Sequence, residues 1–206
     1  MNIRTFIFDL GNVLFKADMS KVIEHWTNLS SLSVQKINSC ILDHKIHFQF
    51  ERGQVTPEDF IKHVQNVLDI PVSYRELVTD WNSIYGDVIQ KNYRSILDCR
   101  QFGKVIAFTN TNEIHLPIWM QKYHEQLSIF DKIYSSCEIG LRKPDAESFQ
   151  YILEDLEVQP AETIFFDDRV ENIEAANKLG INSVLVDTDN RVTSVVSKLV
   201  KKISNT

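Results

Sequence analysis

Asp9 is the first residue of the chain that is placed for chemistry, because it follows the apolar run 5–8. Such a run predicts a buried parallel strand, and ligands bind at the carboxyl ends of parallel strands. An aspartate there serves as a metal ligand, a general base or a nucleophile. Taken alone, Asp9 fits better a structural aspartate that begins an Asx-turn, helped by Gly11.

Two later segments carry further polar side chains in similar positions. The apolar run 105–108 leads into Thr109 and Asn110, a pair that by itself would also suit a helix N-cap. Lys143 precedes Pro144 in a loop before an amphipathic run, where a solvated surface lysine would be the simpler interpretation. Neither segment defines a site alone.

A third segment ends in two adjacent acids. The apolar run 163–166 is followed by Asp167 and Asp168, with Asn172 one helical turn further on. Asp168 would also fit a helix cap. A carboxylate pair after a buried strand is nevertheless typical of a site for a hard divalent cation.

Taken in order, these four motifs resemble those of the haloacid dehalogenase (HAD) superfamily of hydrolases, over essentially the whole chain. Each motif is weak, but the ordered set is specific. Within the superfamily, four stretches are similar to the bacterial glucose-1-phosphate phosphatase branch. They are Asp-Leu-Gly-Asn-Val at 9–13, Phe-Glu-Arg-Gly at 50–53, Thr-Asn-Thr-Asn at 109–112 and Arg-Lys-Pro at 142–144.

Helical periodicity dominates between about residues 20 and 99. Thr56, before Pro57, and Ser73 are predicted N-caps, and the helix after Ser73 is expected to run through Tyr85 towards Val88.

Strands are expected near 104–109, 132–136, 162–166 and 183–187, alternating with helices. The predicted fold is therefore α/β, a Rossmann-like parallel sheet interrupted after its first strand by a helical insert. The resemblance makes this insert a C1 cap, with residues 17–90 as cap and residues 1–16 and 91–206 as core.

The resemblance implies phosphoryl transfer to Asp9, followed by hydrolysis of the aspartyl-phosphate. Mg²⁺ would be held by Asp9, the backbone carbonyl of Gly11 and Asp168, with Asp167 binding through water or orienting Asp168. Thr109 and Lys143 would complete the catalytic group. Substrate contacts are expected from Thr109, Asn110, Lys143 and the cap residue Arg52, and Asn172 would support the site.

Most HAD phosphatases carry a second Asp two residues after the nucleophile, and this chain has Gly11 there. General acid–base help contributes about 10²–10⁴ in rate. Its absence favours substrates with good leaving groups, such as sugar 1-phosphates or acyl phosphates. The cap histidines His44 and His47 are possible replacements, although both are more simply surface residues.

In the cap, Trp26, Trp81 and Tyr85 are expected in the core rather than against a sugar, and Gly53 fits a helix C-cap.

The leading hypothesis is a Mg²⁺-dependent phosphatase of small phosphorylated metabolites. Sugar phosphates are the favoured substrate class. A metal-free 2-haloacid dehalogenase also uses a nucleophilic Asp without the second Asp, but the pair Asp167 and Asp168 would repel its anionic substrate. A non-catalytic binding module remains the third hypothesis.

Composition limits the partners. The net charge of −6 argues against nucleic acid. The three cysteines lack metal spacing and indicate reduced thiols in the cytoplasm. No signal peptide or membrane span is expected. We expect a monomer or weak homodimer.

Overall fold

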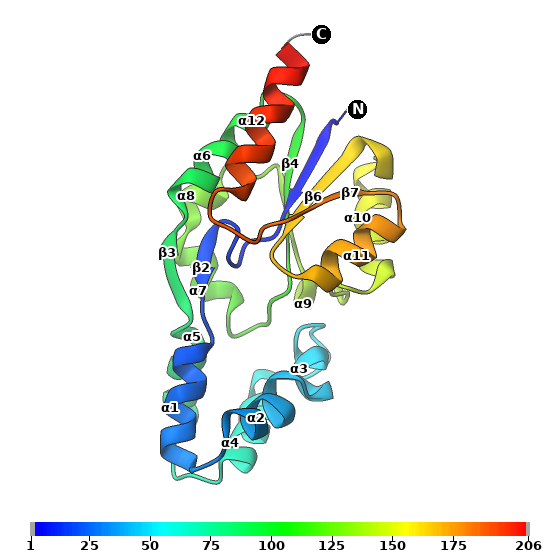
Figure 1. Ribbon diagram of the computed structural model, residues 1–206. Helices are drawn as coiled ribbons and strands as arrows, with labels where there is room; N and C mark the ends of the chain where they lie inside the picture. Colours follow the sequence, from blue (N-terminus) through cyan, green and yellow to red (C-terminus); the bar gives the residue numbers. More distant parts are fainter. Residues whose placement is uncertain (1–2, 205–206) are drawn as a thin grey trace.

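A five-stranded sheet forms the centre of the protein, as the computed structural model of residues 3–204 shows (Figure 1). Residues 1–2 and 205–206, the ends of the two predicted core segments, lie outside the described residues. Every neighbouring pair in this sheet is parallel. Its strands are β1 (Thr5–Phe8), β4 (Lys104–Thr109), β5 (Lys132–Ser135), β6 (Thr163–Asp167) and β7 (Asn182–Leu185). The predicted α/β fold class is confirmed.

The strand order is β5-β4-β1-β6-β7, so β1 lies in the middle. From β1 the chain builds the sheet outward through β4 and β5, and then returns to build the other side with β6 and β7. The carboxyl ends of β4, β1 and β6 therefore meet where the direction of winding changes, which is where doubly wound sheets bind ligands.

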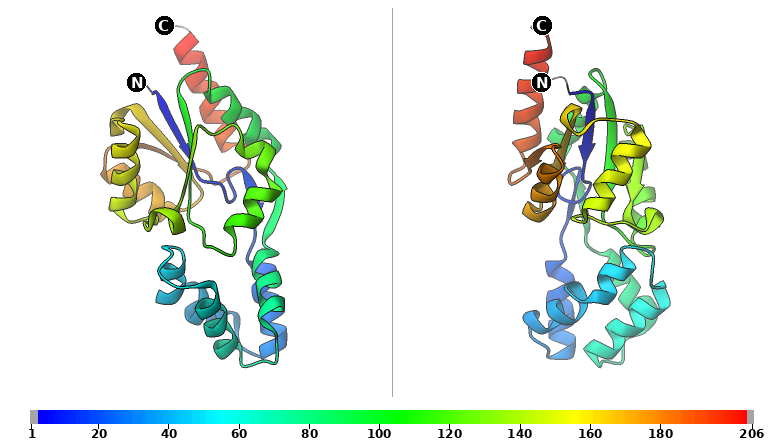
Figure 2. Two further views of the ribbon diagram at one scale, coloured as in Figure 1. Left: turned by 180° about the vertical axis from the view of Figure 1, so that it is seen from behind. Right: turned by 90° about the vertical axis from the view of Figure 1, so that its right-hand side faces the viewer.

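Apolar side chains alternate between the two faces of the sheet. Phe6 and Phe8 join one hydrophobic cluster, and Ile7 points into the other. The first cluster is covered by α6 (Gln90–Cys99), α7 (Leu116–Lys122), α8 (His124–Leu127) and α12 (Arg191–Ser204). The second is covered by α10 (Ala146–Leu156) and α11 (Val170–Lys178). Figure 2 shows α10 and α12 on opposite sides of β1. Two short helices, α9 (Ser136–Ile139) and the 3₁₀ turn Pro160–Glu162, link these elements.

A group of helices lies beyond the carboxyl ends of the sheet strands, at the bottom of Figure 1. Thr56 accepts from the N–H of Asp59, and Ser73 forms a capping box with Glu76, so both predicted N-caps are confirmed. This group has its own hydrophobic cluster, in which Trp26 and Trp81 are fully buried. Its helices are α1 (Ser20–Ser30), α2 (Val34–Ile37), the π-helix Asn38–Leu42, α3 (Lys45–Phe50), α4 (Pro57–Leu68) and α5 (Tyr74–Asn82).

The predicted continuation of the helix after Ser73 towards Val88 is wrong. Helix α5 ends at Asn82, and β3 (Tyr85–Val88) pairs with β2 (Phe15–Ala17) in an antiparallel ribbon. Gly86 disfavours helix and allows close pairing, because a Cβ there would lie 3.0 Å from the Lys16 Cβ. The segment 17–90 is therefore not all helical. The ribbon carries the chain out of the sheet and back again.

No helix within residues 3–204 is long and apolar enough to cross a membrane.

Candidate active site

Asp9 lies directly after β1 and is 9% exposed. Its N–H donates to the carbonyl O of Phe166 at 2.8 Å, so the pairing of β1 with β6 sets its position. The chain then reverses at Asn12, whose φ is 55° and whose N–H donates to the carbonyl O of Phe15 at 2.7 Å. Asparagine tolerates this left-handed backbone better than most residues with a side chain. The short turn after β1 leaves the Asp9 carboxylate at the edge of the sheet.

Lys143 links two of the strand-end acids. Its Nζ donates to Asp9 Oδ1 at 2.8 Å, to Asp167 Oδ2 at 2.7 Å and to the carbonyl O of Phe108 at 2.8 Å. Burial alone would lower the pKa of Lys143, but the charges of Asp167 and Asp9 outweigh it and raise the pKa above its usual range. All three ammonium protons are used, so the charged side chain is held in one orientation.

Asp167 holds this lysine rather than facing an open space. It is fully buried, and its Oδ1 accepts from the backbone N–H of Arg169 and from Asn172 Nδ2, both at 2.8 Å. Its Oδ2 accepts from Lys143. Both carboxylate oxygens are therefore engaged, and Asn172 contributes one of these contacts.

The carboxylates of Asp9, Asp167 and Asp168 lie close enough for their charges to repel one another. Burial raises the pKa of Asp9 to about 7; Lys143 lowers it, and Asp167 and Asp168 raise it again. Burial also raises the pKa of Asp168, which Asn12 partly offsets by donating from Nδ2 to Oδ2 at 3.0 Å. Carboxylates this close do not ionise together easily without further positive charge.

The chemistry of these donors fits a divalent cation. Asp9, Asp167 and Asp168 each offer an oxygen, and these oxygens lie within 4.8 Å of one another. Hard cations such as Mg²⁺ prefer oxygen ligands of this kind. Because both oxygens of Asp167 are engaged, Asp9 and Asp168 have more free lone pairs to offer an ion.

Thr109 and Asn110 follow β4 and line the same region. The Thr109 hydroxyl has only a long contact, 3.5 Å, to the carbonyl O of Asn110, so it is free to donate elsewhere. The Asn110 side chain is engaged with the backbone of Lys143: Nδ2 donates to its carbonyl O at 2.8 Å and Oδ1 accepts from its N–H at 2.9 Å. Asn110 therefore holds the segment 142–145, here called the lysine loop, against the end of β4.

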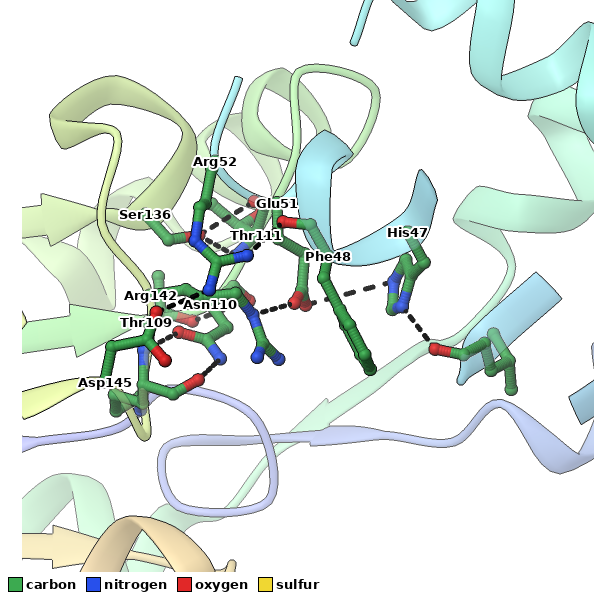
Figure 3. A network of polar contacts seen from close by, with 12 residues as sticks. His47, Phe48, Glu51, Arg52, Thr109, Asn110, Thr111, Ser136, Arg142 and Asp145 are labelled. Atoms are coloured by element: carbon green, nitrogen blue, oxygen red, sulfur yellow. Dashed lines mark hydrogen bonds and ion pairs between the residues drawn. The ribbon is translucent and has the colours of Figure 1, made fainter. Parts of the chain in front are cut away.

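The turn after α3 reaches across to this loop (Figure 3). Glu51 Oε2 accepts from Arg142 Nε at 2.7 Å, and both side chains are nearly buried. Arg52 Nη2 donates to Asp145 Oδ2 at 2.5 Å, and its Nη1 donates to the carbonyl O of Phe48 at 3.0 Å. The sequence singled out Arg52 but missed the Glu51–Arg142 pair, since nothing in a single sequence links residues 91 positions apart.

Gly53 allows this close approach. Its φ is 64°, and a Cβ on it would lie 2.5 Å from the backbone carbonyl O of Cys137 in α9. Any other residue would push the turn away from the sheet. The predicted role of Gly53 as a helix C-cap is wrong, because α3 ends at Phe50 with Glu51 as its C-cap and Gly53 lies two residues further on in the turn.

Two adjoining hollows lie between the helical group and the strand ends. One, of about 270 Å³, is lined by Asp9, Lys143 and Asp168 together with Arg169 and Asn172. The other, of about 160 Å³, has mainly aromatic and apolar walls that include Phe15, Trp81, Tyr85 and Trp119. Both are lined by Gly11, Glu51, Thr109 and Asn110, which therefore mark the passage between them. Trp81 belongs to the core as expected and also forms part of this wall.

Two histidines border the apolar hollow. His47 is mostly buried rather than on the surface; its Nδ1 lies 2.8 Å from the carbonyl O of Leu42 and its Nε2 lies 3.9 Å from Glu51 Oε1. His115, which the sequence did not indicate, stacks on Trp81, and burial lowers its pKa to about 3, with a smaller effect from His47. His44 is exposed and caps α3.

A Rossmann-like α/β sheet therefore carries a buried lysine that joins its strand-end carboxylates, beneath a helical group inserted after the first strand. The chain belongs to the haloacid dehalogenase-like hydrolases, whose family model matches residues 3–180. The resemblance to the HAD superfamily that the motifs predicted is confirmed.

Several similar proteins are phosphatases. A sesquiterpene phosphatase of Aspergillus oryzae is 29% identical over 85% of this chain and 85% of its own. A D-ribitol-5-phosphate phosphatase of Bacteroides thetaiotaomicron is 24% identical over 88% of this chain and 90% of its own. A HAD family enzyme of B. thetaiotaomicron, solved in complex with magnesium and inorganic phosphate, is 30% identical with a TM-score of 0.75, covering 89% and 93% of the two chains. These findings support phosphatase activity in this HAD hydrolase.

Proposed function

We propose that this hydrolase is a Mg²⁺-dependent phosphatase of small phosphorylated metabolites that works through an aspartyl-phosphate on Asp9. The observation that carries the proposal is the Lys143 ammonium between Asp9 and Asp167, with Asp168 alongside. In this arrangement Lys143 orients the nucleophile, favours its charged form and attracts a phosphate.

The chain's own groups divide the work of the first step. Asp9 attacks phosphorus and the ester oxygen leaves. Thr109 donates its free hydroxyl to a phosphate oxygen, and Lys143 balances charge on the transferring group. Asn110 contributes by holding the Lys143 loop, and Arg52 remains a predicted substrate contact, although its guanidinium is paired with Asp145.

The residues present fit a bound Mg²⁺. Asp9, Asp168 and the carbonyl O of Gly11 would hold it, while Asp167 keeps Lys143 in position. The ion would neutralise charge on the phosphoryl group and on the two carboxylates.

Substrate preference follows from Gly11 and from the apolar hollow. Gly11 carries no acid to protonate the leaving oxygen, which favours sugar 1-phosphates or acyl phosphates. The named relatives, however, act on D-ribitol 5-phosphate and on a sesquiterpene phosphate, so relatives of this chain differ widely in the group that leaves. Aromatic walls beside Glu51 and His115 suit a sugar, which presents both apolar faces and hydroxyls.

Two further expectations belong to this proposal. Residues 17–90 would act as a cap over a core made of residues 1–16 and 91–206. Free thiols at Cys40, Cys99 and Cys137 support a reducing compartment such as the cytoplasm.

The decisive experiment is turnover of p-nitrophenyl phosphate with Mg²⁺ and with EDTA. Turnover that requires Mg²⁺ supports the phosphatase, turnover of 2-chloropropionate without metal would support the dehalogenase, and binding without turnover would support the binding module. A panel of phosphorylated metabolites then ranks substrates.

A further inference from the structure

Glu51 stands at the passage between the two hollows. One hollow holds the nucleophile Asp9, and the other offers space for the leaving group. Phosphorus and the bond to be broken would therefore lie near the residues that border both. Among these four residues, Gly11, Thr109 and Asn110 have no side chain that accepts a proton near neutral pH, and Glu51 has a carboxylate.

One carboxylate oxygen of Glu51 is held by a hydrogen bond, and the other has no hydrogen-bond partner among the described residues. Oε2 accepts from Arg142 Nε at 2.7 Å, and the Arg142 guanidinium lies 4.6 Å from the centre of the Phe48 ring. A charge-assisted hydrogen bond of this kind orients the carboxylate. Oε1 lies 3.9 Å from His47 Nε2, beyond hydrogen-bond distance, so its lone pairs remain available.

We infer that Glu51 is the general base of the second half-reaction, taking the place of the Asp that is missing at Gly11; the inference rests on the phosphatase function proposed above. Water attacks phosphorus of the aspartyl-phosphate and gives one proton to Glu51 Oε1. The bond between phosphorus and the Asp9 oxygen breaks, its electron pair returns to the Asp9 carboxylate, and inorganic phosphate is released. Glu51 then loses its proton to solvent.

A purely structural role for Glu51 would predict different behaviour. Two ion pairs join the turn after α3 to the lysine loop, namely Glu51–Arg142 and Arg52–Asp145. Asp145 borders neither of the two hollows described above. Asp145→Asn therefore converts one carboxylate of such a pair into an amide, as Glu51→Gln does, without removing a base from the site.

The experiment follows phosphoryl-enzyme in the full chain with Mg²⁺ and p-nitrophenyl phosphate. Rapid mixing gives the rate of p-nitrophenol release in the first turnover, and intact mass after acid quench gives the decay of phosphoryl-enzyme during a chase. We expect Glu51→Gln to form phosphoryl-enzyme at close to the native rate and to lose it about 10²–10⁴-fold more slowly. Asp145→Asn should lose it at the native rate.

The outcomes separate the inference from the function beneath it. Native-like decay in Glu51→Gln, slow formation without accumulation, or equal slowing in Asp145→Asn would each overturn the base assignment in an active enzyme. A native protein that neither turns over phosphate esters nor becomes phosphorylated would overturn the proposed function itself. Glu51→Asp, which keeps a carboxylate, should decay faster than Glu51→Gln, and equal decay would also contradict the inference. If Glu51→Gln fails to fold, Glu51→Asp against the native enzyme provides the same comparison of formation and decay.

Discussion

Two groups of polar side chains, one on the sheet side of the site and one on the helical side, are held in different ways. The strand-end group belongs to the sheet, and the cap-turn group belongs to the turn after α3. Their members are Asp9, Lys143, Asp167 and Asp168 in the first, and His47, Glu51 and Arg52 in the second. Backbone hydrogen bonds between β4, β1 and β6 fix the strand ends that precede or carry the three acids. In the second group, ion pairs to Arg142 and Asp145 position Glu51 and Arg52.

This difference indicates that the strand-end group is held more rigidly than the turn after α3. On flexible loops, several buried acids around one lysine would move apart because their charges repel one another. A parallel sheet holds the strand ends in place against this repulsion. Breaking a buried pair of this kind costs about 3–5 kcal/mol, while a half-exposed pair such as Arg52–Asp145 contributes about 0.2–1 kcal/mol. We therefore expect changes in the strand-end group to affect the chemical steps and changes at Arg52 to affect mainly binding.

The largest effect is expected for Asp9→Asn. The amide keeps the shape of the side chain but is a far poorer nucleophile and metal ligand, so kcat should fall by about 10⁴–10⁶-fold. Steady-state assays with p-nitrophenyl phosphate measure the loss, and circular dichroism checks the fold. Appreciable turnover in a clean preparation would rule out the covalent mechanism.

Asp168→Ala tests the other carboxylate proposed to hold the ion. Activity should be lost, and so should the stabilisation by Mg²⁺, which for a ligand at one hundred times its Kd amounts to about 2.7 kcal/mol. For a chain of this size that corresponds to about 2–4 °C in Tm per kcal/mol. Asn172→Ala is the comparison, because it removes a contact to Asp167 without removing a proposed ligand. A Mg²⁺-dependent rise in Tm that survives in Asp168→Ala contradicts the metal assignment.

The pH dependence of Mg²⁺ stabilisation tests the repulsion among the acids. The pKa of Asp9 is raised from 3.8 to about 7 in the metal-free fold, so between these values the folded state binds a proton that the unfolded chain has released. Metal-free stability should therefore fall as pH rises through this window. The raised pKa of Asp168 acts in the same direction, and the raised pKa of Lys143 has no effect here because that lysine stays charged in both states.

A Mg²⁺ ion held by Asp9, as proposed, would compete with the Asp9 proton, so Mg²⁺ should raise Tm more at pH 8 than at pH 5. Thermal unfolding with Mg²⁺ and with EDTA at both pH values measures the difference. Asp9→Asn should flatten it. Equal shifts at the two pH values in the native protein would show that Asp9 is already ionised in the metal-free enzyme.

Gly11→Asp tests whether the missing acid limits substrate choice. In the native enzyme, sugar 1-phosphates and acyl phosphates should exceed 6-phosphates and simple alkyl phosphates in kcat/KM. The variant should narrow that gap by about 10²-fold at most, the lower end of general acid help. Space is available, because a Cβ on Gly11 would meet Ala17 Cβ at 3.6 Å and Asp9 Oδ2 at 3.9 Å, both ordinary contacts.

A panel of phosphate esters assayed with both proteins gives the ranking. Equal or better turnover of unactivated alkyl phosphates by the native enzyme would mean that another group supplies the proton. His47, which borders the apolar hollow, would then be the first residue to replace, and the exposed His44 would be its control.

The smallest effect is expected for Arg52→Gln. Loss of its partly exposed pair with Asp145 should cost less than about 1 kcal/mol and raise KM by less than about fivefold, with kcat unchanged. Asp145→Asn should match it if the pair only holds the turn. A much larger rise in KM for Arg52→Gln than for Asp145→Asn would instead establish Arg52 as a substrate contact.

Much of the fold could be predicted because the signals were local. Apolar runs gave the sheet strands to within two residues at either end, and Thr56 and Ser73 gave helix starts, since each signal depends on neighbouring residues. Residues 85–88 were mispredicted as helix. Their strand state depends on pairing with β2, some seventy residues earlier in the sequence.

By itself the sequence determined which side chains end the strands, because a run of apolar residues followed by Asp9, Thr109 or Asp167 specifies that end locally. Only the tertiary structure decided how these groups divide the work. Asp167 and Asn110 hold Lys143, and Glu51 in the turn after α3 pairs with Arg142 beside Lys143. Contacts of this kind depend on strand order and on the docking of the helical group, which are set by packing over the whole chain and not by the residues on either side.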